Sequence, residues 1–73
     1  MSKLPQIKPR EMIKFLKSQG FVLTRVDGSH HRFVHPDGRA TTVAFHNRPL
    51  KKGTLKAILN QVQFSLEEFL KLK

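Results

Sequence analysis

One segment of the sequence combines the residue types that acid–base chemistry requires. It reads Gly28-Ser29-His30-His31-Arg32-Phe33. If this segment is a β-strand, successive side chains point to opposite faces of the sheet. With Phe33 directed into a core, His30 and Arg32 share the open face, while His31 and His35 lie on the covered side or at its rim. We therefore expect His30 to be an exposed imidazole beside a cation, just after a tight glycine turn.

An imidazole in that position suits the cleavage of RNA. RNA supplies its own nucleophile, the 2′-hydroxyl, so an enzyme needs only a proton acceptor, a proton donor and positive groups for the phosphate. Histidine can transfer protons at neutral pH because its unperturbed pKa is about 6.5, and a nearby arginine can stabilise charge that develops on phosphorus. We predict His30 as the catalytic residue and Ser29 and Arg32 as RNA contacts. The simpler alternative is a solvated histidine after an ordinary turn.

Two other chemistries fit the same residues less well. The histidines could hold a metal ion, but no carboxylate or cysteine joins them at ligand spacing, so we expect no metal and no cofactor. A nucleophile–base pair of Ser29 and His30 is disfavoured because neighbours in a strand point to opposite faces. We accordingly expect RNA cleavage to survive chelation by EDTA.

A second group of residues follows near position 50, in the segment Leu50-Lys51-Lys52-Gly53-Thr54-Leu55-Lys56. Cations here crowd the start of a predicted helix, where free N–H groups and the helix dipole already favour phosphate. Lysine at a helix start opposes the dipole, and a bound anion would relieve that cost. We predict Lys51, Lys52 and Lys56 as RNA contacts. A solvated charged rim is the alternative.

The charge of the whole chain favours a polyanionic partner. The 73 residues include 14 Lys and Arg against 5 Asp and Glu, a net charge of +9, and residues 38–66 contain no acid. Nucleic acid is the usual partner of so basic a domain, although an acidic protein surface or simple solubility are alternatives. The chain has no cysteine, no signal-peptide pattern and no apolar run of about 20 residues, so we expect a cytoplasmic protein without a membrane segment.

The elements that must position these residues fit into one domain over residues 1–73, with residues 1–7 as a loose lead-in. Helical spacing after Pro9 predicts a helix over 9–18, and β-forming residues between turn signals predict strands over 21–26, 30–35 and 40–46. Asp27-Gly28 and Pro36-Asp37-Gly38 mark tight turns. Thr54 is expected to cap a second helix and Ser65 a short last one through a capping box. The expected fold is α+β, an α-β-β-β-α order in which helices cover one face of a three-stranded antiparallel sheet.

Several short motifs in this order resemble the HicA family, the mRNA interferase toxins of type II toxin–antitoxin systems. The resemblance covers nearly the whole chain. It is carried by Gly20-Phe21, Gly28-Ser29-His30-His31, His35-Pro36-Asp37-Gly38-Arg39, His46, Lys52-Gly53-Thr54-Leu55, Ile58-Leu59 and Ser65-Leu66-Glu67-Glu68-Phe69. The chain departs from the family at Ala44, where relatives often have proline, and this bears on the geometry of the strand end.

The resemblance implies a fold similar to a double-stranded-RNA-binding domain and an endoribonuclease that cleaves mRNA without the ribosome, with His30 essential. It also implies a HicB-like antitoxin that covers the active surface. His31, His46, Lys52 or water could be the second proton-transfer group. The competing hypotheses are a non-catalytic double-stranded-RNA-binding module and an interaction protein for an acidic partner.

Overall fold

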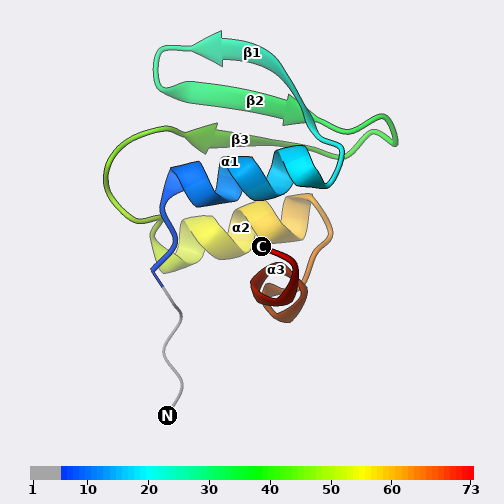
Figure 1. Cartoon of the computed structure of the whole chain (residues 1–73). Coiled ribbons are helices and arrows are strands. Elements are labelled where there is room, and N and C mark those ends of the chain that lie inside the picture. Colours follow the sequence, from blue (N-terminus) through cyan, green and yellow to red (C-terminus); the bar gives the residue numbers. More distant parts are fainter. Residues whose placement is uncertain (1–5) are drawn as a thin grey trace.

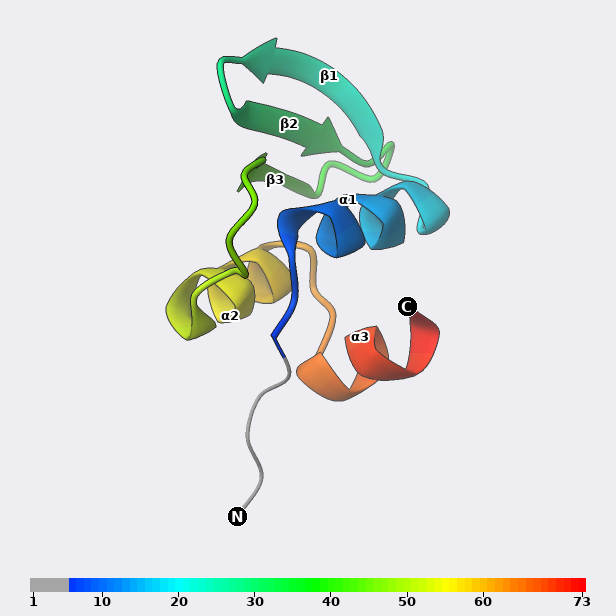
Figure 2. The same ribbon diagram turned by 60° about the vertical axis from the view of Figure 1, so that its left-hand side comes forward.

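The computed structural model describes residues 6–73 and confirms the expected α+β fold. Its elements are α1 (Pro9–Ser18), β1 (Val22–Asp27), β2 (His30–Val34), β3 (Ala40–Ala44), α2 (Lys52–Gln61) and α3 (Leu66–Leu72). The strands form one antiparallel sheet in the order β1-β2-β3. Figures 1 and 2 show the helices on one side of this sheet, with α1 and α2 near β3 and with β1 farthest from them. The other face of the sheet is open.

Helix α1 has the bounds that the sequence predicts. Pro9 occupies its first turn, where the missing N–H needs no partner. Gly20 follows the helix with a positive φ of 89°, and the N–H of Phe21 donates to the carbonyl of Leu16 at 3.0 Å. Because the backbone N–H of Phe21 completes the helix end, β1 begins one residue later than expected.

The core lies between the sheet and the three helices. Phe33 and Val43 reach it from β2 and β3, and both are fully buried. On the helical side, Phe15 meets the ring of Phe69 edge-on at a centroid distance of 4.8 Å. Thr41, a buried polar residue of this core, donates from its hydroxyl to the side-chain oxygen of Gln61 at 2.6 Å. The sheet therefore commits one face to packing and leaves the other free.

Part of the expected lead-in belongs to the core. Ile7 is 1% exposed, and its carbonyl accepts a hydrogen bond from the N–H of Leu50 at 2.6 Å. Residues 1–5 of the lead-in lie outside the described residues. The chain before α1 is thus tied to the chain before α2, an arrangement that periodicity along either segment does not reveal.

The prediction that Thr54 caps α2 is wrong. The helix begins at Lys52, and Lys51 is its N-cap with an extended backbone and no side-chain cap. The carbonyl of Lys51 already accepts from the N–H of Leu55 at 2.8 Å. Thr54 therefore stands within the first turn, and the first N–H groups of α2 have no capping side chain.

The capping box at α3 is confirmed. The Ser65 hydroxyl accepts from the N–H of Glu68 at 3.0 Å, and the Glu68 carboxylate accepts from the N–H of Ser65 at 2.8 Å. Helix α3 places Phe69 in the core.

None of the helices within residues 6–73 combines the length and the apolar character of a membrane span.

Candidate active site and nucleic-acid interface

The β1–β2 hairpin presents His30 on the open face of the sheet, as the strand alternation predicts. Gly28 takes a φ of 63° at the turn, which a glycine adopts without steric cost. Asp27 is the last residue of β1 instead of a turn residue. His30 is exposed and Phe33 is fully buried, so the side chains of β2 divide between the two faces.

A hollow on the open face surrounds His30. It is lined by Arg25, Asp27, His30, Arg32 and Thr42. In the strand register, Arg25 lies opposite Arg32, which lies opposite Thr42. In the adjoining row, Asp27 lies opposite His30. The guanidinium of Arg32 donates to the Thr42 hydroxyl at 3.2 Å, so it leans across β2 toward β3. One imidazole, one carboxylate and two guanidiniums therefore share the hollow.

Three residues of this hollow, Arg25, Asp27 and Thr42, were not among the predicted site residues. The β1–β2 ladder shifts register between Leu23 and Arg25, which inserts Thr24 as an extra residue. The Thr24 hydroxyl donates to the carbonyl of Arg32 at 3.3 Å. A bulge of this kind changes which face the following side chains point to. Regular alternation from Leu23 would have directed Arg25 to the helical side, whereas the bulge directs it to the open face.

The other three histidines lie in different surroundings. His31 is half-buried on the opposite face from His30, with its Nδ1 3.0 Å from the carbonyl of Ser29 and its ring 5.4 Å from that of Phe45. His35 packs edge-on against Phe21 at 5.0 Å, which makes it a packing residue. Both fit the predicted covered side or rim.

The third of them, His46, lies outside the sheet. Strand β3 ends at Ala44, two residues earlier than expected. His46 is therefore in the loop that follows, exposed, and its Nδ1 accepts from the N–H of Arg48 at 3.2 Å. The ladder stops there because β2, its partner, begins at His30, which pairs with Ala44.

A second hollow connects the sheet with the start of α2. Its lining includes Ala44, His46, Arg48 and Lys51. Ala44 is also the Cα partner of His30 in the β2–β3 ladder. The hollow at Lys51 and the hollow around His30 share no lining residue, and Ala44 is the point at which they approach each other.

The predicted RNA contacts are exposed but are not all together. Lys51, Lys52 and Lys56 are exposed in or beside the first turns of α2, and Arg32 is exposed on the sheet. Ser29 is exposed in the hairpin turn, and its carbonyl accepts from the N–H of Phe45 at 2.7 Å. The structure thus brings Arg32 next to His30 and places the three lysines beyond the end of β3.

Arg39 has a packing role, although it falls in the acid-free stretch. Its guanidinium donates to the carbonyl of Val62 at 2.6 Å and to the carboxylate of Asp37 at 2.8 Å, and it lies 5.2 Å from the Phe21 ring centroid. The backbone N–H of Arg39, followed by its guanidinium, holds the pKa of Asp37 below its usual range. Arg39 thus joins the β2–β3 turn to the end of α2.

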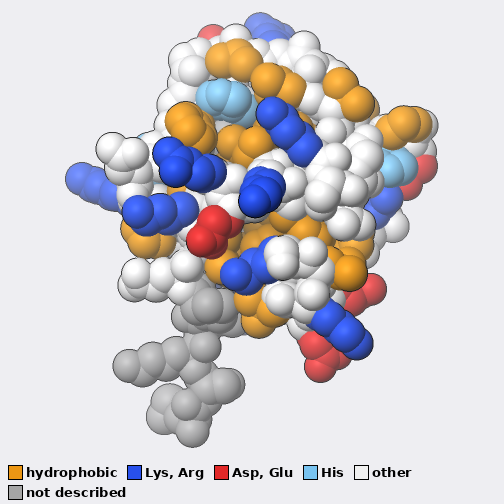
Figure 3. Space-filling view, in the orientation of Figure 1, with side chains coloured by type: hydrophobic (Ala, Val, Ile, Leu, Met, Phe, Trp, Pro, Cys, Tyr) orange, Lys and Arg blue, Asp and Glu red, His pale blue; other side chains and the backbone are white. Residues whose placement is uncertain are grey.

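The face that carries the helices is both basic and partly apolar. Figure 3 shows Lys and Arg side chains spread over it, with hydrophobic and histidine side chains in its upper part. Val26 on β1 and Phe45 after β3 are 54% and 45% exposed.

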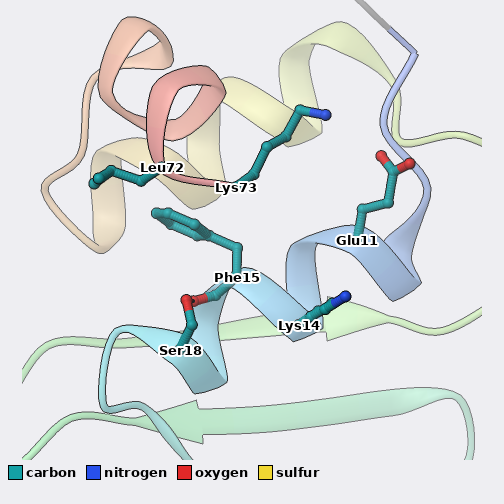
Figure 4. A pocket seen from close by; sticks show the side chains of 6 residues that line it. All are labelled: Glu11, Lys14, Phe15, Ser18, Leu72 and Lys73. Atoms are coloured by element: carbon teal, nitrogen blue, oxygen red, sulfur yellow. Dashed lines mark hydrogen bonds between the residues drawn. The ribbon is translucent and has the colours of Figure 1, made fainter.

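A further hollow lies between α1 and the end of α3. Phe15 forms its floor, and Glu11, Lys14, Ser18, Leu72 and Lys73 line the rest. Figure 4 shows the Phe15 ring between Leu72 and Ser18, with Glu11 and Lys14 farther along α1. No residue of the sheet lines it, so it is separate from His30.

Within residues 6–73, no three histidine, aspartate or glutamate side chains are grouped as a metal site would require.

A family model described as the HicA toxin of bacterial toxin-antitoxin matches residues 9–64 of the 73. The chain belongs to the HicA toxin family. This match extends from α1 through the hairpin of His30 to the residues after α2, so it includes the hollow around His30 and the hollow at Lys51. No curated protein matches the chain. Membership in the HicA family makes the chain a toxin of a toxin–antitoxin system and implies a cognate antitoxin.

Proposed function

We propose that this HicA toxin is a ribosome-independent endoribonuclease that cleaves mRNA, and that His30 transfers a proton in the reaction. The observation that carries the proposal is the exposure of His30 on the open face, in one hollow with two arginines. Histidine transfers protons at neutral pH, and guanidinium groups stabilise charge on a phosphate. Packing does not account for His30, because the core is on the other face of β2.

The reaction that fits these groups is transesterification within the RNA. The 2′-oxygen gives up its proton, bonds to the adjacent phosphorus and displaces the 5′-oxygen of the next nucleotide, which takes up a proton. The products are a 2′,3′-cyclic phosphate and a free 5′-hydroxyl. His30 would supply one of the two proton transfers. His46, Lys52 and water remain candidates for the other, whereas His31 lies on the opposite face of the strand from His30.

RNA would reach the hollow from the start of α2. The uncapped helix start with Lys51 and Lys52 offers cations and free N–H groups to phosphate. The small side chain of Ala44 lies between that region and His30. We therefore propose that an RNA strand passes from the α2 lysines over Ala44 to His30.

The cognate antitoxin is proposed to be a HicB-like protein that neutralises the toxin by covering this surface. The net charge of +9 favours an acidic partner surface over the same lysines and arginines. An antitoxin bound there would compete directly with RNA.

The test is the substitution His30→Ala. We expect inducible expression of the native chain to arrest bacterial growth and fragment total RNA, and His30→Ala to do neither. With purified protein the cleavage rate should fall by about 10²–10⁴, the usual contribution of a positioned proton-transfer group. The circular dichroism spectrum should not change, because His30 is exposed, and RNA binding should be retained because Arg32 and the α2 lysines are the proposed RNA contacts.

A companion variant is His46→Ala, which removes another exposed histidine and tests it as the second proton-transfer group. If His46 supplies the second proton transfer, this variant also loses cleavage; if it does not, the variant behaves as the native chain. Equal cleavage by His30→Ala and the native protein would refute the catalytic role of His30. A native protein that binds double-stranded RNA without cleaving it would support the non-catalytic alternative.

A further inference from the structure

Arg25 and Arg32 form a pair of like charges that no salt bridge in the described part of the fold compensates. They are direct partners in the antiparallel β1–β2 ladder, and both are exposed. Like charges directly opposite each other destabilise a sheet. Among residues 6–73 neither arginine forms a salt bridge, and the salt bridges there involve Asp37.

The β-bulge in β1 is what creates this pair. The extra residue Thr24 changes the phase of the strand, so that Arg25 and Asp27 point to the open face with Arg32 and His30. With regular alternation Arg25 would point to the helical face. The bulge is held by the hydrogen bond from the Thr24 hydroxyl to the carbonyl of Arg32. Bulges often re-aim a side chain beside a functional site.

Both guanidiniums keep N–H donors free for a ligand, because among residues 6–73 the Arg25 side chain makes no hydrogen bond and Arg32 makes only one. Arg32 uses one guanidinium nitrogen on the Thr42 hydroxyl at 3.2 Å, which restrains its side chain across the sheet. Arg25, Arg32 and Thr42 form one row of the hollow, and His30 stands in the next row between Asp27 and Ala44. An anion held by the two guanidiniums would therefore lie one row from the His30 imidazole, and the Asp27 carboxylate stands in that same row.

We propose that Arg25 and Arg32 form a binding site for one RNA phosphate, the phosphate at which the chain is cut, with the Thr42 hydroxyl positioning Arg32. Guanidinium groups bind phosphate through paired N–H donors in a fixed planar geometry, which lysine does not reproduce. A phosphate also removes the repulsion between the two arginines. That the bound phosphate is the scissile one rests on the ribonuclease activity proposed above, whereas phosphate binding by the pair does not.

The first experiment measures phosphate binding without cleavage. Inorganic phosphate is titrated into the His30→Ala protein while NMR follows the arginine Nε–Hε signals. The signals of Arg25 and Arg32 should respond at lower phosphate concentration than that of Arg10, an exposed arginine on α1. Adding Arg25→Gln should shift the response of Arg32 to higher phosphate. Equal responses of Arg10 and Arg25, or no effect of the substitution on Arg32, would overturn the binding site.

The second experiment measures cleavage of an RNA oligonucleotide by the otherwise native protein. Arg25→Gln should lower kcat by about 100-fold, in line with the loss of a group that stabilises transition-state charge. Arg25→Lys should restore only part of it. The control Lys17→Gln removes one exposed positive charge from α1 and should leave kcat within about twofold. If Arg25→Gln and Lys17→Gln have the same kcat, the pair does not hold the scissile phosphate.

The two experiments separate the two proposals. Loss of kcat in Arg25→Gln together with loss of cleavage in His30→Ala supports both. Phosphate binding by Arg25 and Arg32 in a protein whose cleavage does not need His30 refutes the role of His30 and retains the phosphate site. Cleavage that needs His30 but is unaffected by Arg25→Gln retains the role of His30 and refutes the assignment of the pair to the scissile phosphate.

Discussion

In the first turn of α2, Lys52 is a proposed RNA contact but lowers the stability of the helix. The substitution Lys52→Glu should therefore raise stability and weaken RNA binding. Lys52 is the first residue of the helix, no acidic residue stands in its first turn, and its N-cap makes no side-chain hydrogen bond. A positive charge at this end opposes the helix dipole, and a negative charge there is favourable, each by about 0.3–1 kcal/mol. Replacing Lys52 with Glu removes the unfavourable interaction and adds the favourable one, so the free energy of unfolding should rise by about 1 kcal/mol.

The expected gain is large enough to measure by thermal denaturation. For a domain of this size, 1 kcal/mol corresponds to a rise in Tm of about 4–8 °C. Lys56→Glu is the matched control, because either substitution replaces the like-charged i,i+4 pair of Lys52 and Lys56 with an ion pair. Lys56 stands one turn further on, where the dipole effect has largely faded. The difference in Tm between the two variants therefore isolates the interaction with the helix start.

The same two variants also test the contribution of each lysine to RNA binding. Removing one phosphate contact should reduce the slope of log K against log salt by about 0.7–0.9, and both substitutions should weaken binding. The assays are circular dichroism melting and RNA titration at several salt concentrations, in the His30→Ala background so that the toxin can be produced. A Tm for Lys52→Glu equal to or below that of Lys56→Glu would refute the claim that α2 begins with an uncompensated positive charge.

Two further substitutions test local features of the fold. Because its partners lower the pKa of Asp37 from the usual value of 3.8, its ionised form stabilises the fold above that pH, and the contribution is lost as pH falls through the lowered pKa. Asp37→Asn should therefore lower Tm slightly at pH 7, and the difference from the native protein should disappear in acid, where Asp37 is protonated; a difference that persists in acid would contradict the assignment. Gln63 follows α2 with a φ of 62°, a conformation that costs a non-glycine residue about 1–2 kcal/mol. Gln63→Gly should raise stability to urea by up to about 1 kcal/mol after its greater unfolded-chain entropy is subtracted, and Gln63→Ala should give no gain.

The sequence by itself determined the features that neighbouring residues encode. Pro9 and the apolar spacing after it set the bounds of α1, and the Ser65 capping box set the start of α3. The glycine turn and the alternation of β2 placed His30 opposite in direction to Phe33, which made it a candidate for catalysis. These signals are local because caps, turns and strand alternation depend on residues a few positions apart.

The tertiary structure alone decided what depends on pairing between distant segments. The bulge at Thr24 exists only in the register of β1 against β2, so neither the placement of Arg25 nor that of Asp27 followed from alternation along β1. Ile7 is buried in the core, in a segment whose backbone is held by the hydrogen bond from the N–H of Leu50 to the carbonyl of Ile7. Strand β3 ends at Ala44, where the pairing with His30 ends. A hydrogen-bonded ladder or a packed core forms between two segments that are distant in the sequence. The position of a residue in it therefore depends on the partner segment as well as on the residue's own neighbours.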